Sequence, residues 1–210
     1  TNAIAALETD DIQALSNSSL AALKTGQVKA LSTDQVVALT TAQMGSLSTS
    51  AINALSSSQV AAIETDDIQA LSSKQLGSLA TSTIAALTTD QVVALTTAQV
   101  STLATATLKA LSSSQIQAIE TADIQALTSA QISTLTTATV AALSTDQIQA
   151  LQTSQINKLS TAGVAALSTD QVVALTTEQV GNLTTAVVQA LSTNAIAALE
   201  TDDIQALSNS

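Results

Sequence analysis

The sequence contains no cysteine, histidine, proline, phenylalanine, tryptophan or tyrosine, and it has five lysines but no arginine. Without histidine or cysteine it lacks the side chains that most often titrate near neutral pH or act as activated nucleophiles, so enzymatic activity is not expected. Without cysteine there is no disulfide framework, and the redox compartment cannot be inferred. No apolar run approaches the roughly 20 residues that span a bilayer, so membrane insertion is not expected either.

Acidic residues dominate the charge, because sixteen Asp and Glu against five Lys give a net charge of −11. Such a surface repels phosphate backbones, so nucleic acid is not an expected partner. At the same time 46% of the 210 residues are apolar, and nearly all of these are Ala, Val, Ile or Leu. A core without aromatic rings must be thin, which favours a repeat architecture over one central core.

The chain divides from Thr1 into 26 octads with two residues left over, and the consensus is T-x-Q-[IV]-x-A-L-[ST]. Position 4 is Ile, Val, Leu or Met in every octad, and position 7 is Leu except at Ile63 and Ile119. Residues 1–18 recur identically as residues 193–210, so 24 octads form a higher-order repeat of 192 residues. These regularities predict one continuous solenoid over residues 1–210, cut from a longer array.

Each octad is predicted to hold one short helix of about six residues. Residues 32–35 (STDQ) and 40–43 (TTAQ) match the capping box, in which a Ser or Thr side chain accepts the N3 amide and Gln reaches back to the cap. Leu31 and Val36 have the spacing of a hydrophobic staple. One continuous helix is excluded, because an eight-residue repeat drifts by about 80° per octad. The predicted fold is an all-α solenoid, and the alternative is a β-solenoid, because Thr, Val and Ile are common.

Six octads lack the consensus Ala at position 6 and have a small or polar residue at position 5, and their spacing indicates how many octads make one superhelical turn. They are octads 6, 10, 13, 17, 20 and 23, with a mean spacing of 3.4 octads. Each is followed by an octad that lacks Gln at position 3, namely at Ala51, Thr83, Thr107, Thr139, Gly163 and Val187. We interpret them as one column along the solenoid. Its explanations are close approach between turns, lateral contact with another chain, or chance. The column comprises Gly45, Ser46, Gly77, Ser78, Ser101, Thr102, Ser133, Thr134, Asn157, Lys158, Gly181 and Asn182.

Where an octad ends in Glu, one or two Asp residues follow at the start of the next octad, and we call each such cluster an acidic corner. Carboxylates this close together are candidate ligands for Ca²⁺, which accepts flexible oxygen ligands. The simpler interpretation is that the acids cap helices and complement the helix dipole, and no other cofactor is expected. The candidate residues are Glu8, Asp10, Asp11, Glu64, Asp66, Asp67, Glu200, Asp202 and Asp203, with a smaller corner at residues 120–123.

Two further chemistries are considered and set aside. The segment Ser72-Ser73-Lys74 could be imagined to hold a catalytic Ser/Lys pair, but adjacent residues on a helix do not face each other. Regular threonines are also found on ice-binding surfaces, which need flat ranks of hydroxyl groups. At 3.4 octads per turn the threonine columns would precess along the solenoid instead of forming such ranks.

The L-[ST]-T-x-Q-[IV]-x-A-L units, as in residues 39–44 (LTTAQM) and 95–100 (LTTAQV), resemble the Thr/Ala/Gln/Leu octapeptide arrays of very large secreted bacterial surface proteins, often described as adhesin-like. The resemblance is compositional and covers the whole chain, and such arrays carry no catalytic residues. It implies an extracellular or cell-surface filament, stalk or matrix fibre that assembles with itself end to end or laterally. The alternatives are an adhesin-type binding module, whose polar column contacts a ligand, ion or surface, and an engineered repeat protein.

Overall fold

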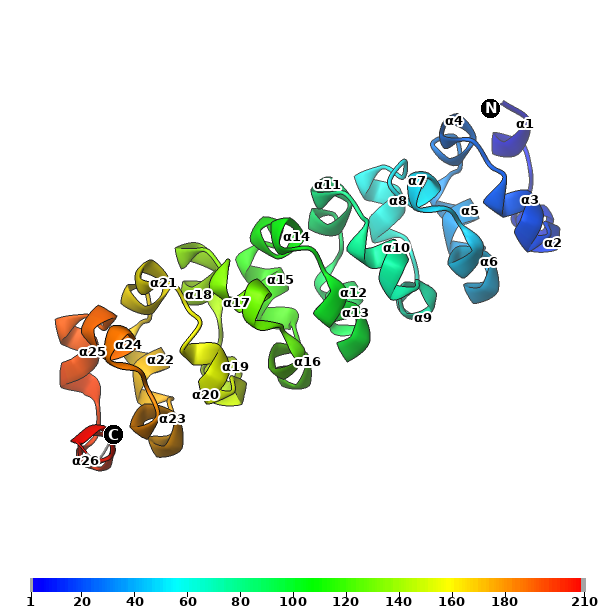
Figure 1. Cartoon of the computed structure of the whole chain (residues 1–210). Helices are drawn as coiled ribbons and strands as arrows, with labels where there is room; N and C mark the ends of the chain where they lie inside the picture. Colours follow the sequence, from blue (N-terminus) through cyan, green and yellow to red (C-terminus); the bar gives the residue numbers. More distant parts are fainter. Residues whose placement is uncertain (1, 209–210) are drawn as a thin grey trace. The chain divides into compact units, whose positions relative to one another are not determined.

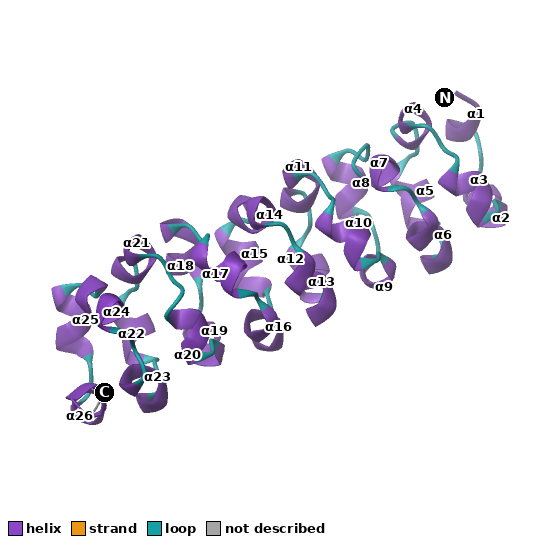
Figure 2. Cartoon of the chain, in the orientation of Figure 1, coloured by secondary structure: helices purple, strands orange, loops and turns teal. Residues whose placement is uncertain are grey.

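The computed structural model describes residues 2–208, and these form 26 helices and no strand (Figures 1 and 2). Every octad contributes one helix. Helices α1 to α25 have four to six residues and α26 has eight, close to the predicted length of about six. The prediction of an all-α solenoid built from one short helix per octapeptide is therefore confirmed, and the β-solenoid alternative is wrong for the described residues.

The chain separates into two compact units, Thr1–Ala110 and Leu111–Ser210, which are described separately. The predicted continuity of the solenoid from one unit to the other stays a prediction. Unit 1 contains α1 (Asn2–Ala5), α2 (Thr9–Ala14), α3 (Asn17–Ala21), α4 (Thr25–Val28), α5 (Thr33–Val37), α6 (Thr41–Ser46), α7 (Thr49–Ile52), α8 (Ser57–Ala61), α9 (Thr65–Ala70), α10 (Ser73–Gly77), α11 (Thr81–Ala85), α12 (Thr89–Val93), α13 (Thr97–Thr102) and α14 (Thr105–Ala110). Unit 2 contains α15 (Ser113–Ala118), α16 (Thr121–Ala126), α17 (Ser129–Ser133), α18 (Thr137–Ala142), α19 (Thr145–Ala150), α20 (Thr153–Ile156), α21 (Thr161–Ala165), α22 (Thr169–Val173), α23 (Thr177–Gly181), α24 (Thr185–Ala190), α25 (Thr193–Ala198) and α26 (Thr201–Ser208).

Helices whose octad has Gln at position 3, such as α5 and α6, begin at the capping boxes that the sequence predicts. At α5 the Ser32 hydroxyl accepts the backbone N–H of Gln35 at 3.1 Å, and the Gln35 Oε1 accepts the N–H of Ser32 at 2.9 Å. The staple residues Leu31 and Val36 are 5% and 0% exposed. Helices this short are unstable alone, so the caps set their boundaries while packing on other turns must supply most of their stability.

The chain reverses direction between helices without special backbone conformations. The position 7 leucines Leu15 and Leu47 end α2 and α6 in extended conformations, with φ/ψ of −65°/137° and −62°/140°. Within residues 2–208 no residue has a positive φ and no peptide bond is cis. Because the reversal needs only an extended leucine, the octad can repeat without a turn glycine or proline.

Within each unit a helix packs on the helix three octads further along, as α3 packs on α6 and α6 on α9, and as α16 packs on α19. The side-chain hydrogen bonds of Gln43 reach back 28 to 31 residues, to the C-terminal end of the helix four octads earlier. A turn of each unit therefore holds between three and four octads. This agrees with the predicted pitch of 3.4 octads per turn.

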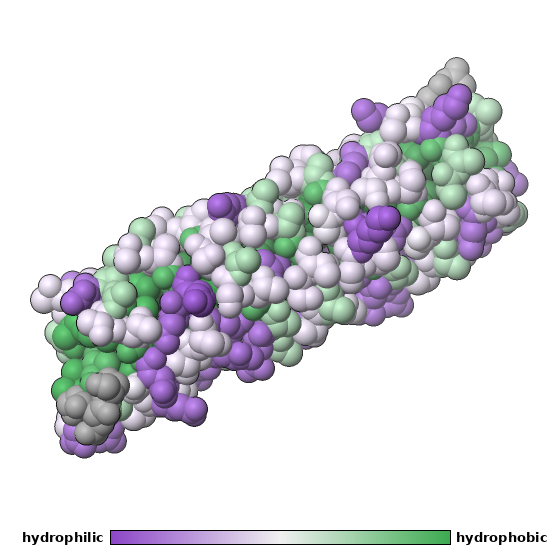
Figure 3. Space-filling view, viewed as in Figure 1, coloured by the Kyte–Doolittle hydropathy of each residue, from purple (hydrophilic) through white to green (hydrophobic). Residues whose placement is uncertain are grey.

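The core of each unit is a narrow file of aliphatic side chains from positions 4 and 7. Val100 and Val172 at position 4 are 0% exposed, and Leu71 and Leu151 at position 7 are 2% and 3% exposed. On the face shown in Figure 3, weakly polar residues cover most of each unit. Among residues 2–208, no helix combines the length and the apolar character that crossing a bilayer requires.

Candidate functional site

Where position 3 is glutamine, its side chain forms hydrogen bonds with the backbone of the turn before it. The Gln43 Nε2 donates to the backbone carbonyls of Ile12, Gln13 and Leu15 at 2.9, 3.0 and 2.8 Å. Its Oε1 accepts the N–H of Thr40 at 2.9 Å. The Gln43 carboxamide is 2% exposed. It thus forms hydrogen bonds both with a free backbone N–H at the start of its own helix and with free backbone carbonyls at the end of a helix four octads earlier.

This arrangement recurs throughout both units. Buried amides with these partners are worth about 1 kcal/mol per hydrogen bond, and leaving them unpaired costs more. The repeated contact is therefore the main polar interaction between turns. Its members include Gln35, Gln43, Gln59, Gln75, Gln91 and Gln99 in unit 1, and Gln147, Gln155, Gln171 and Gln179 in unit 2.

Two asparagines replace this contact where position 3 is not glutamine. In unit 1 the Asn53 Oδ1 accepts the N–H of Ala80 at 2.7 Å, and its Nδ2 donates to the Ser78 carbonyl at 3.3 Å. In unit 2 the Asn157 Oδ1 accepts the N–H of Thr184 at 2.9 Å, with its Nδ2 on the Asn182 carbonyl at 2.9 Å. Here the earlier turn supplies the side chain. Sequence reasoning missed Asn53, although it precedes Thr83 by the same interval at which Asn157 precedes Val187.

The structure places the predicted column in contacts within each unit. A Cβ on Gly45 would lie 3.2 Å from the Ala70 carbonyl oxygen, and one on Gly77 would lie 2.9 Å from that of Thr102. The Thr102 hydroxyl donates to the Gln99 carbonyl at 2.8 Å. Several other column hydroxyls likewise bond to backbone carbonyls, from Ser46, Ser101, Ser133 and Thr134. Lateral contact of the column with another chain stays a prediction.

The acidic corners are spread out by the helices that carry them. Glu64 and Asp66 are exposed while Asp67 is 2% exposed, so the side chains do not converge. Within residues 2–208 no group of three or more acidic side chains is placed to hold a metal ion. In the first corner Asp11 Oδ2 accepts the N–H of Glu8 at 3.1 Å, which is a capping contact. The remaining candidates, Asp10, Glu200, Asp202 and Asp203, lie at or beside the starts of α2 and α26.

Ser72, in the segment once considered as a catalytic Ser/Lys pair with Lys74, caps a helix. Its hydroxyl donates to the Gln75 Oε1 at 2.6 Å and accepts the N–H of Gln75 at 3.2 Å. The Gln75 Oε1 also accepts the backbone N–H of Ser72 at 2.8 Å, which completes a capping box like those at Ser32 and Thr40.

Asp67 occupies position 3, where half of the octads have the bridging glutamine. Its Oδ2 is buried and has no hydrogen-bond partner. Burial raises the pKa of this carboxyl above its usual range, a hydrogen bond from the Thr41 hydroxyl opposes the rise, and the charges of Glu64 and Asp66 add to it. The ionised side chain is therefore a local cost to the stability of unit 1 at neutral pH.

We expect Asp67→Asn to stabilise the protein at pH 7 by roughly 1 kcal/mol, the size of a buried polar group left without a partner. Because the folded-state pKa is raised, the wild type has its greatest relative stability below the ordinary pKa of 3.8 and loses it as the pH rises through the folded value. The gain of the variant should therefore grow between about pH 4 and pH 7. Urea unfolding followed by circular dichroism across this range measures it.

The exposed Asp34, on the same unit, provides the matched control for this experiment. Asp34→Asn removes one charge without relieving a buried carboxyl, so its effect should stay within about 0.5 kcal/mol. An Asp67→Asn variant whose gain is the same at pH 4 and pH 7 would show that burial of the ionised carboxyl is not a cost.

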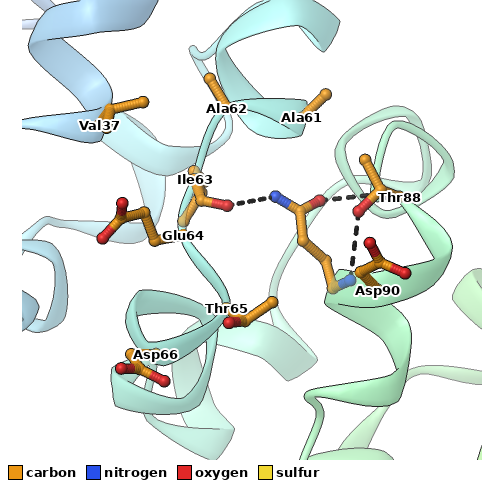
Figure 4. Close-up of a pocket in the computed structure, with 10 residues that line it drawn as sticks. Val37, Ala61, Ala62, Ile63, Glu64, Thr65, Asp66, Thr88 and Asp90 are labelled. Atoms are coloured by element: carbon orange, nitrogen blue, oxygen red, sulfur yellow. Dashed lines mark hydrogen bonds between the residues drawn. The ribbon is translucent and has the colours of Figure 1, made fainter.

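A groove of about 610 Å³ in unit 1 has both apolar and acidic walls (Figure 4). Val37, which is 42% exposed, lies on one side, with Glu64, Asp66 and Asp90 also lining the groove. Gln91 lies within it and donates from Nε2 to the Ile63 carbonyl at 2.6 Å. The groove thus exposes one valine among carboxylates.

Octapeptide helices stacked into turns and joined by carboxamide–carbonyl bonds define a helical repeat solenoid. The chain belongs to the ALTTAQ repeat family, which matches residues 4–41, 60–97, 116–153, 149–185 and 182–209. Residues 38–43 and 94–99 spell the ALTTAQ motif itself. The first three matches begin at positions 4, 60 and 116, at intervals of seven octads, or about two turns. No curated protein matches the sequence.

Proposed function

We propose that this chain is a non-catalytic structural protein that forms an extracellular filament, stalk or matrix fibre. The glutamine contact between turns is the observation that carries the proposal. An octad with Gln at position 3 offers a carboxamide to the turn before it and backbone carbonyls to the turn after it. Gln43 donates to the Leu15 carbonyl, and the Leu47 carbonyl of the same octad accepts from Gln75. Such a contact can be extended without limit, because each added turn presents backbone carbonyls to the glutamines of the next turn.

The higher-order repeat supports the same function. The identity of residues 1–18 and 193–210 means that successive 192-residue copies have matching sequences at their junctions. The surface of hydroxyl groups, with sixteen acids and few lysines, gives a soluble array that repels nucleic acid. The likeness to secreted octapeptide arrays supports a location outside the cell.

Electron microscopy of the purified chain and antibody labelling of intact source cells test this proposal. We expect long filaments of uniform width and labelling without permeabilisation.

An adhesin-type binding module is the second candidate, favoured by the groove around Val37, Glu64 and Asp66. Isolated particles at all protein concentrations, with surface labelling retained, would contradict the fibre and favour the binding module. Labelling only after permeabilisation would contradict both.

A further inference from the structure

The groove in unit 1 combines an aliphatic wall with exposed carboxylates. Val37, at the end of α5, and Ala62 form part of the wall, and Glu64 and Asp66 lie next to it at the start of α9 (Figure 4). Asp90 lies on the opposite side of the groove. All three acids are exposed. No lysine is among the described residues that line the groove, so these charges meet no cation there.

The sequence repeats the combination of an exposed valine and a glutamate one turn later. Twenty-seven residues correspond to about one turn at 3.4 octads per turn. Beyond residue 27, a glutamate ends an octad only where a valine lies 27 residues before it, at position 5. A single exposed valine needs no explanation, but a valine that recurs only with this glutamate indicates a shared role. The pairs are Val37 and Glu64, Val93 and Glu120, and Val173 and Glu200, and the valines are 42%, 44% and 45% exposed.

Unit 2 contains a groove in the same register that has different side chains. Its volume is about 370 Å³, and each of its lining residues lies eleven octads after a lining residue of the groove in unit 1. The stacking of octads therefore forms the groove, and side chains at a few positions decide what it can bind. Gln125, Gln152 and Glu178 occupy the places of Val37, Glu64 and Asp90, in that order.

The side chains of the groove in unit 1 define the chemistry of a ligand. A ligand that contacts Val37 and reaches Glu64 and Asp66 needs an aliphatic stem with a positive charge at its end. Lysine and arginine side chains have this form. Burial raises the pKa of Asp67, and the charges of Glu64 and Asp66 raise it further, so the corner carries a concentrated negative charge. The net charge of −11 also attracts cationic partners over a longer range.

We infer that the groove of unit 1 binds a lysine or arginine side chain of a cationic partner protein. The aliphatic stem lies against Val37, and the charged end lies against the carboxylates of Glu64 and Asp66. Asp90 adds to the negative potential from the other side. The groove of unit 2, which lacks both the valine and the glutamate, does not bind this ligand. The inference rests on the binding module, the second candidate for the proposed function, and names the class of its ligand.

Carbodiimide cross-linking of a short peptide to the chain tests the inference, with the cross-linked sites mapped by mass spectrometry. The peptide is acetylated and amidated and carries two lysines among glycines and serines. We expect cross-links at Glu64 and Asp66 to exceed those at the exposed Asp34 and Asp170 about threefold, the effect of a partly exposed ion pair. High salt should reduce this preference. A peptide with diaminopropionate in place of lysine has the same charge on a shorter stem, so it should show little preference.

Substitutions in the groove separate the role of the stem from the role of the charge. Val37→Gln keeps the charge of the chain and removes the aliphatic contact, so it should abolish the preference for lysine over diaminopropionate. Glu64→Gln should lower cross-linking at Asp66 about threefold. Val93→Gln is the matched control, because Val93 is 44% exposed in the same unit but does not line this groove. It should leave cross-linking at Glu64 and Asp66 unchanged.

The groove of unit 2 allows the reverse experiment. The double substitution Gln125→Val and Gln152→Glu should create a second site and bring cross-links to position 152. Cross-links spread evenly over the exposed acids would overturn the inference, as would a double variant that gains none at position 152. Either result would leave the fibre proposal intact, because electron microscopy tests that proposal separately. Far-ultraviolet circular dichroism verifies that each variant is folded.

Discussion

Replacing Gln43 with methionine is expected to lower the free energy of unfolding by about 2–4 kcal/mol, since each buried polar group left unpaired costs about 1–3 kcal/mol. Methionine fills nearly the same volume but offers neither donor nor acceptor to the turn before it. The backbone carbonyls of Ile12, Gln13 and Leu15 lose the Nε2 donor, and the N–H of Thr40 loses its acceptor. Urea unfolding followed by circular dichroism measures the change.

Gln27 is the matched control for this substitution, because it occupies position 3 of an octad with no turn before it in this sequence. Gln27→Met removes only the acceptor of the Lys24 N–H, so its cost should be about 0.5–1 kcal/mol in dilute solution. Equal costs at Gln43 and Gln27 would show that the contact between turns adds nothing to the helix cap, and would remove the physical basis of the proposed fibre.

The helices and their caps could be predicted because they depend on neighbours within one octad. Ser32, Gln35, Leu31 and Val36 lie within six residues of one another, and their cap and staple interactions form as the local pattern predicts. The pitch was predictable for another reason. A column of altered residues records the periodicity of the turns, so counting octads between Gly45 and Gly77, or between later members, measures the turn without coordinates.

The second role of glutamine could not be derived from the capping box. The Gln43 Oε1 completes the local cap, and nothing in the octad indicates that the Nε2 of the same side chain has partners 28 and 31 residues earlier. That information depends on how turns stack. The only signal is the preference for Gln over Glu at position 3, because a carboxylate would complete the same cap but could not donate to carbonyls.

The acidic corners show the same limit of local reasoning. Residues 9–16 and 65–72 have the identical sequence TDDIQALS, yet Asp11 is exposed and Asp67 is 2% exposed. The two octads differ in their surroundings, because the octad of Asp67 packs on an earlier turn and the octad of Asp11 lies in the first turn of the sequence. The shift in the pKa of Asp67 therefore comes from the position of the octad in the array, and a motif-based interpretation treats the two aspartates alike.

Gly77→Ala is expected to destabilise the protein by about 1–2 kcal/mol, although alanine favours helix formation by about 1 kcal/mol over glycine. The added Cβ would lie 2.9 Å from the carbonyl oxygen of Thr102, a backbone atom that moves only if the next turn moves. At Gly45 the corresponding distance is 3.2 Å to the Ala70 carbonyl oxygen, so Gly45→Ala should cost less. The loss of stability is therefore expected to be larger for Gly77→Ala than for Gly45→Ala, because the turns approach more closely at Gly77.

Gly26 supplies the control, because it is exposed near the start of α4 and its substitution adds a methyl group facing solvent. Gly26→Ala should leave stability unchanged or raise it by up to about 1 kcal/mol. Thermal unfolding of the three variants separates the effect of glycine on helix propensity from its effect on close packing between turns. If Gly77→Ala is as stable as Gly26→Ala, the glycines of the column do not serve close packing within the chain. The lateral contact with another chain would then become the better interpretation of the column.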